Sequence, residues 1–426
     1  MSFLEGLHAR RGDVLDGCVG CGRCAEVCPM IEPAELQTSD AAALTRSIVS
    51  WIRDGVGSAE AAEWARVCSG SGRCIPACGY GVNPRFMLSL ARLAVQTASL
   101  AEADRRRAGV ESFRTVTQGA RLLSRLQLSP ELLARVEGHE APADADTLLY
   151  TGCNVLKTPH IVLLCLDVLE RLGRRVAVRG GSKHCCGVLH FQAGDAETGG
   201  RLGTASMARL EHGGFRQVLA WCPTCQIQFG EQLLPSHERS GAALPFTMEP
   251  FIVFLASQLE HLRPLMVHEV RKRVGLHEHS GLNGATEAAL RVLAEIPALE
   301  IVDLQERQLG YMCNTLNPLP ELKRQSHLEL LERASAAGVD ALVGVFHACH
   351  RDLCSHERDW PFEVVNIMEL VGQSLGATHE DGFKRLKLIG DAERILEDCR
   401  DLIEAHGLSE DECRTVIARD LLGQRS

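Results

Sequence analysis

The sequence lacks several features that would place it in common protein classes. Aromatic residues make up 4% of the chain against 45% hydrophobic residues, so aliphatic side chains must fill any core. No basic stripe is long enough to follow a phosphate backbone, and the net charge of −10 argues against a nucleic-acid partner. The apolar stretches 161–166 and 251–256 are far shorter than the roughly 20 residues that a bilayer span needs.

The start of the sequence also lacks a basic segment followed by an apolar one, so we expect no secretion. No nucleotide fingerprint or phosphate-binding loop is present either, so flavin or nicotinamide chemistry must come from another chain. We therefore expect a cytoplasmic protein, peripheral to the membrane if a partner holds it there.

Cysteine, by contrast, is abundant, and it is clustered. The 426 residues include 18 cysteines, gathered in motifs rather than spread as a disulfide framework. In a reducing cytosol, such motifs serve as metal ligands or redox centres. The length indicates two to four domains.

The first motif is C-x2-C-x2-C-x3-C-P, formed by Cys18, Cys21, Cys24 and Cys28. This is the spacing of a ferredoxin loop around a cubane [4Fe-4S] cluster, in which the fourth ligand comes from a partner loop. Cluster 1 would accordingly take Cys18, Cys21, Cys24 and Cys78. The alternative is a zinc site, although zinc favours two separated cysteine pairs.

A second copy of this motif carries Ser71 where a cysteine would recur. By the same rule, cluster 2 would take Cys28, Cys68 and Cys74, with Ser71 at its fourth corner. Three outcomes stay open: a [3Fe-4S] cluster, a [4Fe-4S] cluster with a serine or water ligand, and no cluster, with the cysteines structural. Serine is a harder donor than thiolate, so either cluster would have altered redox behaviour.

The pattern of the chain changes after the two loops. Residues 1–100 read as a helical unit, with helices predicted at 40–53 and 86–97, and residues 101–145 read as a charged helical linker. From 146 onward, short apolar strands alternate with helices. The predicted strands 147–150, 175–178 and 217–221 each lead into a cysteine motif, which indicates one edge of a parallel sheet.

This α/β layout repeats. Ser280 follows Cys153 by 127 residues, and Cys313 follows Cys186 by the same 127. Three such landmarks, His350 after Cys225 at 125 residues being the third, indicate a duplication. The predicted units are 146–262 and 263–376, followed by a C-terminal helical extension, 377–426, in which Cys399 and Cys413 are expected to be plain helix residues.

The cysteines of the first α/β unit follow the pattern C-x31-C-C-G-x34-C-x-x-C. The pattern resembles the cysteine-rich CCG domain of heterodisulfide reductase catalytic subunits, also found in glycolate oxidase iron–sulfur subunits and lactate-utilisation proteins. The resemblance implies a noncubane [4Fe-4S] cluster, with Lys183 and His184 as candidate hydrogen-bond donors around it. Its ligands would be Cys153, Cys185, Cys186, Cys222 and Cys225. A thioredoxin-type pair at Cys222 and Cys225, or a zinc site, are the alternatives.

The second unit departs from the CCG pattern, because Ser280, Met312, His347 and His350 stand where cysteines are expected. It is either a degenerate repeat kept as scaffold or a repurposed pocket for a metal such as zinc or iron, or for proton transfer. The candidate residues of such a pocket are His277, His279, Cys313, His347, Cys349 and His350.

The resemblance covers nearly the whole chain, and it implies an α-helical two-cluster ferredoxin domain followed by two α/β, Rossmann-like CCG repeats. The implied function is an iron–sulfur electron-transfer subunit that works with a flavoprotein dehydrogenase or electron-transfer flavoprotein and with a quinone, cytochrome or other redox partner. The alternative is a heterodisulfide-reductase-like catalyst that cleaves or forms a disulfide at the noncubane cluster.

Overall fold

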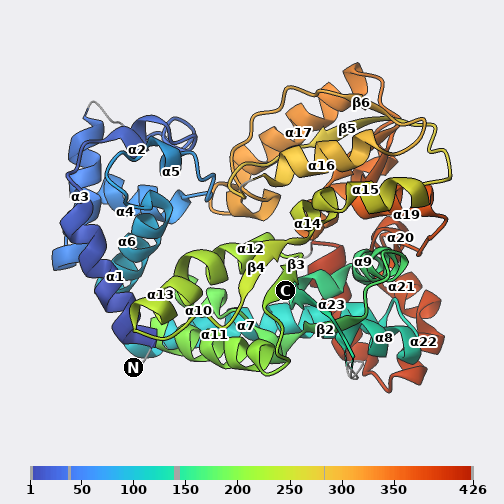
Figure 1. Cartoon of the computed structure of the whole chain (residues 1–426), viewed down its shortest axis with the longest axis horizontal. Helices are drawn as coiled ribbons and strands as arrows, with labels where there is room; N and C mark the ends of the chain where they lie inside the picture. Colours follow the sequence, from blue (N-terminus) through green and yellow to red (C-terminus); the bar gives the residue numbers. More distant parts are fainter. Residues whose placement is uncertain (1–2, 37–39, 139–143, 283, 424–426) are drawn as a thin grey trace.

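The computed structural model describes residues 3–36, 40–138, 144–282 and 284–423. The chain folds into an all-helical N-terminal unit and an α/β part that holds two parallel four-stranded sheets (Figure 1). The boundary expected at 140–144 lies, apart from residue 144, outside the described residues.

Local capping explains where the N-terminal helices begin and end. Asp40 accepts a hydrogen bond from the backbone N–H of Ala43 at the start of α3, and Gly55 ends this helix with a φ of 72°. Asn83 caps α6, which has Pro84 in its first turn. The helices of this unit are α1 (Phe3–Gly17), α2 (Arg23–Glu26), α3 (Ala41–Asp54), α4 (Ala59–Val67), α5 (Cys74–Ala77) and α6 (Pro84–Ser99).

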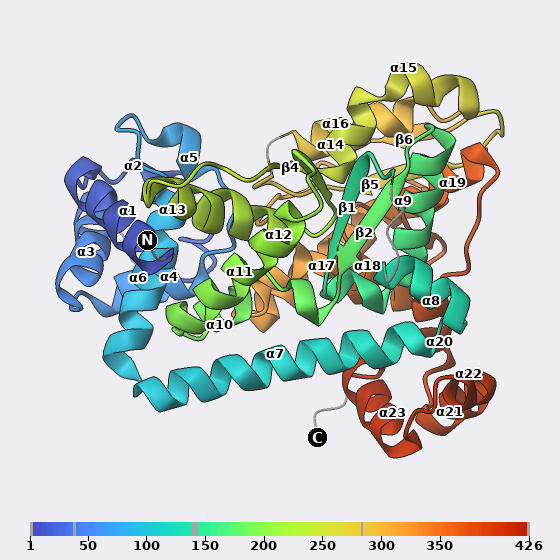
Figure 2. The ribbon, with the colours of Figure 1, turned by 60° about the horizontal axis from the view of Figure 1, so that its bottom comes forward.

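A long helix then runs beneath the molecule. Helix α7 (Glu102–Arg125) extends from the helical unit toward α8 (Pro130–Glu137), as Figure 2 shows. It packs against both the first α/β unit and the last helices of the chain. The segment predicted as a helical linker is thus observed as helices that pack against other parts of the chain.

The first sheet has the strand order β2-β1-β3-β4, with every neighbouring pair parallel. Leu149 and Leu219 point to one face, while Leu148 and Val218 point to the other, as the two-residue period of strands requires. Its strands are β1 (Thr147–Gly152), β2 (Val176–Gly180), β3 (Gln217–Ala220) and β4 (Thr247–Pro250). Its helical segments are η1 (Asn154–Lys157), α9 (Pro159–Arg171), η2 (Ser182–His184), α10 (Val188–Gln192), α11 (Ala196–Glu211), α12 (Pro223–Ile227), η3 (Gln228–Leu233), α13 (Leu234–Arg239), α14 (Phe251–Ser257), α15 (Leu259–Leu262) and η4 (Arg263–Leu265).

The second sheet has the order β6-β5-β7-β8 and is also parallel throughout. The two orders are the same when counted from the first strand of each unit, as a duplication requires. Its strands are β5 (Arg273–His277), β6 (Glu300–Val302), β7 (Ala341–Gly344) and β8 (Glu363–Asn366). Its helical segments are α16 (Ala285–Ala294), η5 (Cys313–Leu316), α17 (Pro320–Ala336), α18 (His347–Leu353), η6 (Cys354–Arg358) and α19 (Ile367–Leu375).

One hydrophobic core joins the two α/β units. Helix α14 packs on α16, and α9 packs on α19, so each unit covers a face of the other. The same core takes in the C-terminal helices and includes Cys399 and Cys413, which are 1% and 0% exposed. These helices are α20 (Gly382–Ile389), α21 (Ala392–Asp398), α22 (Arg400–Ala405), α23 (Glu410–Val416) and η7 (Ile417–Leu421).

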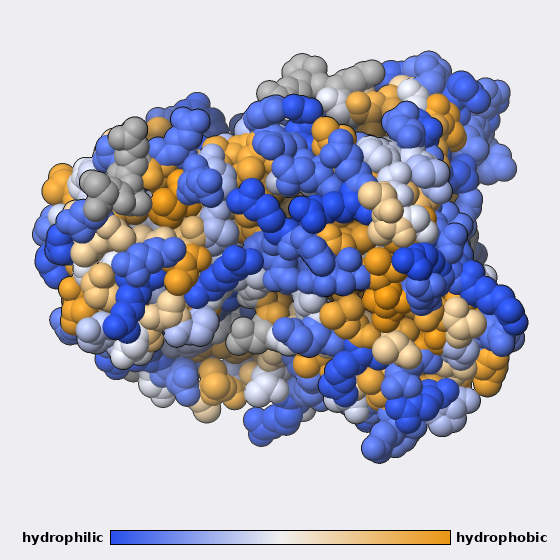
Figure 3. Space-filling model, turned by 90° about the horizontal axis from the view of Figure 1, so that it is seen from above, coloured by the Kyte–Doolittle hydropathy of each residue, from blue (hydrophilic) through white to orange (hydrophobic). Residues whose placement is uncertain are grey.

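The surface is mixed in character. On the face shown in Figure 3, hydrophilic residues predominate and hydrophobic ones interrupt them in patches. Among the described residues, no helix is both long enough and apolar enough to cross a bilayer.

Candidate cluster-binding sites

The structure brings the cysteines assigned to cluster 1 around one small cavity. Cys18 follows α1 directly, Cys21 lies in the loop, Cys24 sits in α2, and Cys78 comes from the end of α5. Thr45 and Met87 complete the lining from α3 and α6. Two loops far apart in the sequence thus supply thiols to a single point.

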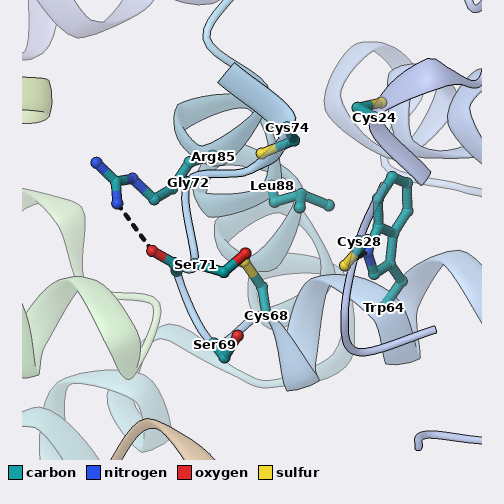
Figure 4. A pocket seen from close by; sticks show the side chains of 11 residues that line it. Cys24, Cys28, Trp64, Cys68, Ser69, Ser71, Gly72, Cys74, Arg85 and Leu88 are labelled. Atoms are coloured by element: carbon teal, nitrogen blue, oxygen red, sulfur yellow. Dashed lines mark hydrogen bonds between the residues drawn. The ribbon is translucent and has the colours of Figure 1, made fainter. Parts of the chain in front are cut away.

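A second cavity adjoins the first and contains the altered motif. Its lining includes Cys28, Cys68, Cys74 and Ser71, as Figure 4 shows. Cys24 lines this cavity as well as the first, so the two cavities are direct neighbours.

Trp64 and Arg85 frame the second cavity. The indole Nε1 of Trp64 donates a hydrogen bond of 3.3 Å to the Cys28 sulfur. The Arg85 guanidinium donates to the carbonyl of Gly70, 2.8 Å away (Figure 4). Neither contact is visible in the motif, because both side chains come from helices outside it.

The thiols of the helical unit are costly to ionise where they stand. Burial raises the pKa of Cys24 to about 11, and burial together with nearby Cys68 and Cys28 raises the pKa of Cys74 to about 12. Clustered, buried thiolates are stable when a cation neutralises them. The donor set fits iron–sulfur clusters at both cavities.

Five further cysteines meet at the carboxyl ends of β1, β2 and β3. Cys225 and Cys186 lie with their sulfurs 3.6 Å apart, and the backbone N–H of Gly187 donates to the Cys185 sulfur at 3.3 Å. Cys153 follows β1, and Cys222 follows β3. All five predicted ligands share this edge of the sheet.

Two glycines make room for this convergence. Gly187 has a φ of 79°, and a Cβ there would lie 2.1 Å from the carbonyl oxygen of Gly199. Gly152 has a φ of 70°, and its Cβ would lie 3.1 Å from the Cys225 sulfur. The Gly of the Cys-Cys-Gly turn is therefore required by the backbone.

The five thiols perturb one another strongly. Hydrogen bonds from Cys153 and Cys186 lower the pKa of Cys185, and a hydrogen bond from Cys225 lowers the pKa of Cys222. The pKa values of the three donors are correspondingly raised. Such a buried thiol–thiolate group suits a polynuclear metal cluster, which would replace the shared protons.

The groups around these cysteines differ from those predicted. The His184 ring lies 2.9 Å from the carbonyl oxygen of Gly180, and Lys183 contributes a backbone carbonyl to Arg209. The Tyr150 hydroxyl donates to the carbonyl of His184 at 2.5 Å and also lies 3.8 Å from the Cys225 sulfur. Sequence reasoning missed Tyr150, although an inward-facing polar residue on a strand leading into a cysteine motif is a usable signal.

Comparison with known proteins agrees with both groups of sites. Residues 17–83 match the 4Fe-4S dicluster domain, and residues 147–230 match the cysteine-rich domain CCG. The chain joins an iron–sulfur dicluster domain to a CCG domain.

A curated relative spans both parts. Its name makes it a subunit of a fumarate reductase (CoM/CoB), from Methanothermobacter marburgensis. The two sequences are 24% identical over 377 residues, which are 84% of this chain and 72% of that protein. The recognition of the ferredoxin and CCG architecture is confirmed, and the cysteine-rich domains mark the chain as an iron–sulfur protein.

The second α/β repeat lies beyond the matched CCG range, and its candidate residues divide between three places. His277, His279, Cys313 and Cys349 form one group whose donor atoms lie within 4.8 Å of one another. The other two candidates, His347 and His350, are directed elsewhere. Successive residues of α18 point about 100° apart, so 347, 349 and 350 cannot face one centre.

His347 faces the CCG domain. It is fully buried, and its imidazole is among the groups that lower the pKa of the Cys222 thiol, after Cys225. His350 instead contacts Asp381, with 2.6 Å between its Nε2 and the carboxylate. His160 of α9 and Glu369 of α19 complete that buried group.

An open cleft lies beside Cys153. Arginines of α7 form one wall, and Gly181 and Ser182 form part of the other. Arg121 pairs with Glu412 at 2.9 Å, and a carboxylate also faces Arg125. The cleft gives one cysteine of the CCG group a route to solvent.

Proposed function

We propose that the chain is an iron–sulfur electron-transfer subunit, carrying electrons between a flavoprotein dehydrogenase or electron-transfer flavoprotein and a quinone, cytochrome or second redox partner. Iron–sulfur clusters supply one-electron transfer when bound. The protein's own contribution is to hold the cysteine loops in a continuous series.

The strongest support for a connected path from the ferredoxin loops to the CCG cysteines is the position of one tyrosine. Tyr311 spans the space between the second ferredoxin loop and the CCG cysteines. A Cβ on Gly70 would lie 2.6 Å from the Tyr311 ring, and the Tyr311 hydroxyl lies 3.4 Å from the Thr224 hydroxyl. Thr224 stands between Cys222 and Cys225, so the side chains of Tyr311 and Thr224 bridge the space between the two sites.

Contacts around Tyr311 hold this junction together. The Ser69 hydroxyl donates to the carbonyl of Leu309, two residues before Tyr311. Arg85 donates to the carbonyls of Gly70 and Gly281, at 2.8 and 2.6 Å. Short, packed junctions of this kind favour electron transfer over substrate passage.

The proposal extends to the cofactors. The cavity at Cys18 would hold a [4Fe-4S] cubane, and the five CCG cysteines would hold a noncubane [4Fe-4S] cluster. The cavity at Cys28 would hold a [3Fe-4S] or serine-ligated [4Fe-4S] cluster, because Ser71 lines it beside Cys68 and Cys74. A partner chain is supported by the relative, whose name marks it as one subunit of a reductase.

The test compares two electron donors on the anaerobically purified protein. Flavodoxin hydroquinone is a protein donor that cannot enter the cleft beside Cys153, whereas reduced methyl viologen is small enough to do so. In the variant Cys74→Ser, we expect flavodoxin to reduce the CCG centre about tenfold more slowly or worse, since the series loses a ligand. Rapid-freeze EPR gives the rates.

Methyl viologen should reduce the CCG centre of that variant at the wild-type rate. The matched control, Cys165→Ala, removes a buried cysteine of α9 outside the cluster loops and should leave both rates unchanged. Equal flavodoxin rates in wild type and Cys74→Ser would contradict the proposal.

The cleft beside Cys153 favours a second candidate function, disulfide chemistry at the CCG centre. The cleft opens beside one cysteine of the CCG group, and the relative's name contains CoM/CoB. Oxidation of reduced methyl viologen on addition of the CoM–CoB heterodisulfide, by the purified chain alone, would favour this function over electron transfer.

A further inference from the structure

The second α/β repeat contains four metal-binding side chains that converge on one point. The Nε2 of His277 lies 3.1 Å from the Cys313 sulfur, and the Nε2 of His279 lies 3.0 Å from the Cys349 sulfur. Two imidazole nitrogens and two thiol sulfurs therefore face a common centre, all within 4.8 Å of one another.

Both imidazoles are held from behind. The Nδ1 of His277 contacts the carboxylate of Glu306 at 2.8 Å, and the Nδ1 of His279 contacts the carbonyl oxygen of Gly310 at 3.1 Å. These contacts point the Nε2 atoms at the two sulfurs. Carboxylates and carbonyls occupy this outer position on most metal-binding histidines.

The group is buried, and without a metal it is electrostatically crowded. Cys313 is 3% exposed and Cys349 is 0% exposed. The Glu306 carboxylate lies 2.8 Å from His277, so negative charge stands directly behind the four donors. A cation at the centre would neutralise the two thiolates that a metal site requires.

We propose that this group is a closed, tetrahedral Cys2His2 site that binds Zn²⁺. Two nitrogen and two sulfur donors are a usual zinc set, and four protein ligands leave no open position, as in structural sites. This assignment goes beyond electron transfer, because Zn²⁺ is not oxidised or reduced in proteins.

The site occupies the same place in the second repeat as the CCG cysteines occupy in the first. Its ligands come from the end of β5, the start of η5 and helix α18, which correspond to the three segments that bear cysteines in the CCG domain. A bound metal would hold this edge of the sheet together in a repeat that lacks the cluster cysteines. Through the contact of His279 with its carbonyl oxygen, the site would also fix Gly310, next to Tyr311 at the junction with the dicluster domain.

The test measures metal content and needs no activity. We expect the full chain, purified anaerobically, to hold zinc in addition to iron, and Cys349→Ser to lose the zinc while iron content and EPR signals stay unchanged. Cys354→Ser is the matched control: Cys354 is buried five residues further along, lies outside the four-donor group, and its loss should leave zinc in place.

A second variant tests the site without removing a ligand, in case Cys349→Ser fails to fold. Glu306→Gln leaves all four donors intact but removes the charge that orients His277, so chelator competition should show zinc affinity about 10–100-fold lower. Cobalt substituted into the wild type should show thiolate charge-transfer bands that Cys349→Ser abolishes. The proposal would be overturned if the wild type held no zinc. It would also be overturned if Cys349→Ser kept its zinc and Glu306→Gln bound zinc with unaltered affinity, or if Cys349→Ser lost iron and not zinc.

Discussion

At the scale of single residues, the hydrogen bond from Trp64 to Cys28 has a measurable consequence. An N–H donor stabilises the more negative, reduced state of a thiolate-bound cluster and so raises its reduction potential. We predict that Trp64→Phe lowers the midpoint potential of the cluster held by Cys28. With about 1 kcal/mol for the bond, the shift is about 40 mV.

An EPR-monitored redox titration checks this shift. Trp51→Phe is the matched control, because its indole donates to the carbonyl of Ser58 and not to a cysteine. The control should leave every potential unchanged, and an equal shift in both variants would show that the effect of Trp64 is not due to its hydrogen bond.

The residues that spacing could predict are those within the motifs. Cys18, Cys153 and their partners were found from the sequence because cluster loops require fixed intervals, and the structure brings each set together. Trp64 and Tyr311 could not be found this way, since each reaches its site through tertiary packing. Spacing also grouped His347 and His350 with Cys349, whereas the turn of α18 sends them to different neighbours.

At the scale of elements, a buried polar group joins α9, α18, α19 and the start of α20. His160 lies 3.4 Å from Asp381 and 3.7 Å from Glu369, while His350 and Lys384 also face this group. Burial opposes protonation of His160, but the Asp381 and Glu369 carboxylates outweigh it and raise its pKa. Asp381, at the start of the C-terminal helices, is thus held to both α/β units by its interactions with His160 of α9 and His350 of α18.

The raised pKa of His160 predicts how stability depends on pH. Stability from such a histidine is fully present below its unfolded pKa of about 6.5 and is lost as pH rises through the raised folded value. We therefore predict that the free energy of unfolding falls as pH rises from about 6.5 through the raised folded pKa of His160, by at most about 1.4 kcal/mol per pH unit for this one group. Urea titrations at several pH values measure the slope.

His160→Gln should flatten that slope. His406→Gln is the control, because His406 lies in the C-terminal helices but outside this buried group, with its Nε2 2.8 Å from the carbonyl oxygen of Leu128. A slope that persists in His160→Gln would assign the pH dependence to another group.

The elements themselves were largely predictable, since their limits depend on local signals. The helix predicted at 40–53 is observed as Ala41–Asp54, capped by Asp40 and Gly55, and the strand expected at 147–150 is observed as Thr147–Gly152. The offset between the repeats likewise indicated two sheets, which have the same strand order. How α14 packs on α16 to merge the two units was not predictable, because no local pattern specifies such contacts.

At the scale of the whole molecule, Arg85 is the point where the three main units meet. It lies on α6 of the helical N-terminal unit and forms an ion pair with Glu231 of the first α/β unit, with Nε 2.9 Å from the carboxylate. It also donates to the carbonyl of Gly281 in the second repeat. The two charged side chains are 12% and 15% exposed, so solvent screens them little.

We predict that Glu231→Gln loosens the docking of the dicluster domain by about 2 kcal/mol, because it leaves a buried guanidinium without its carboxylate. Hydrogen exchange should accelerate in the segments 69–72 and 309–312, while the strands of both sheets keep their protection. Asp13→Asn is the matched control, since the pair of Asp13 with Arg239 also joins the helical N-terminal unit to the first α/β unit but is more than half exposed on both sides. Its loss should accelerate exchange far less, because solvent screens an exposed ion pair. If the two variants behave alike, the buried ion pair of Arg85 does not control the docking, and other contacts, such as the apolar one of Met30 and Val67 with Leu309, hold the junction.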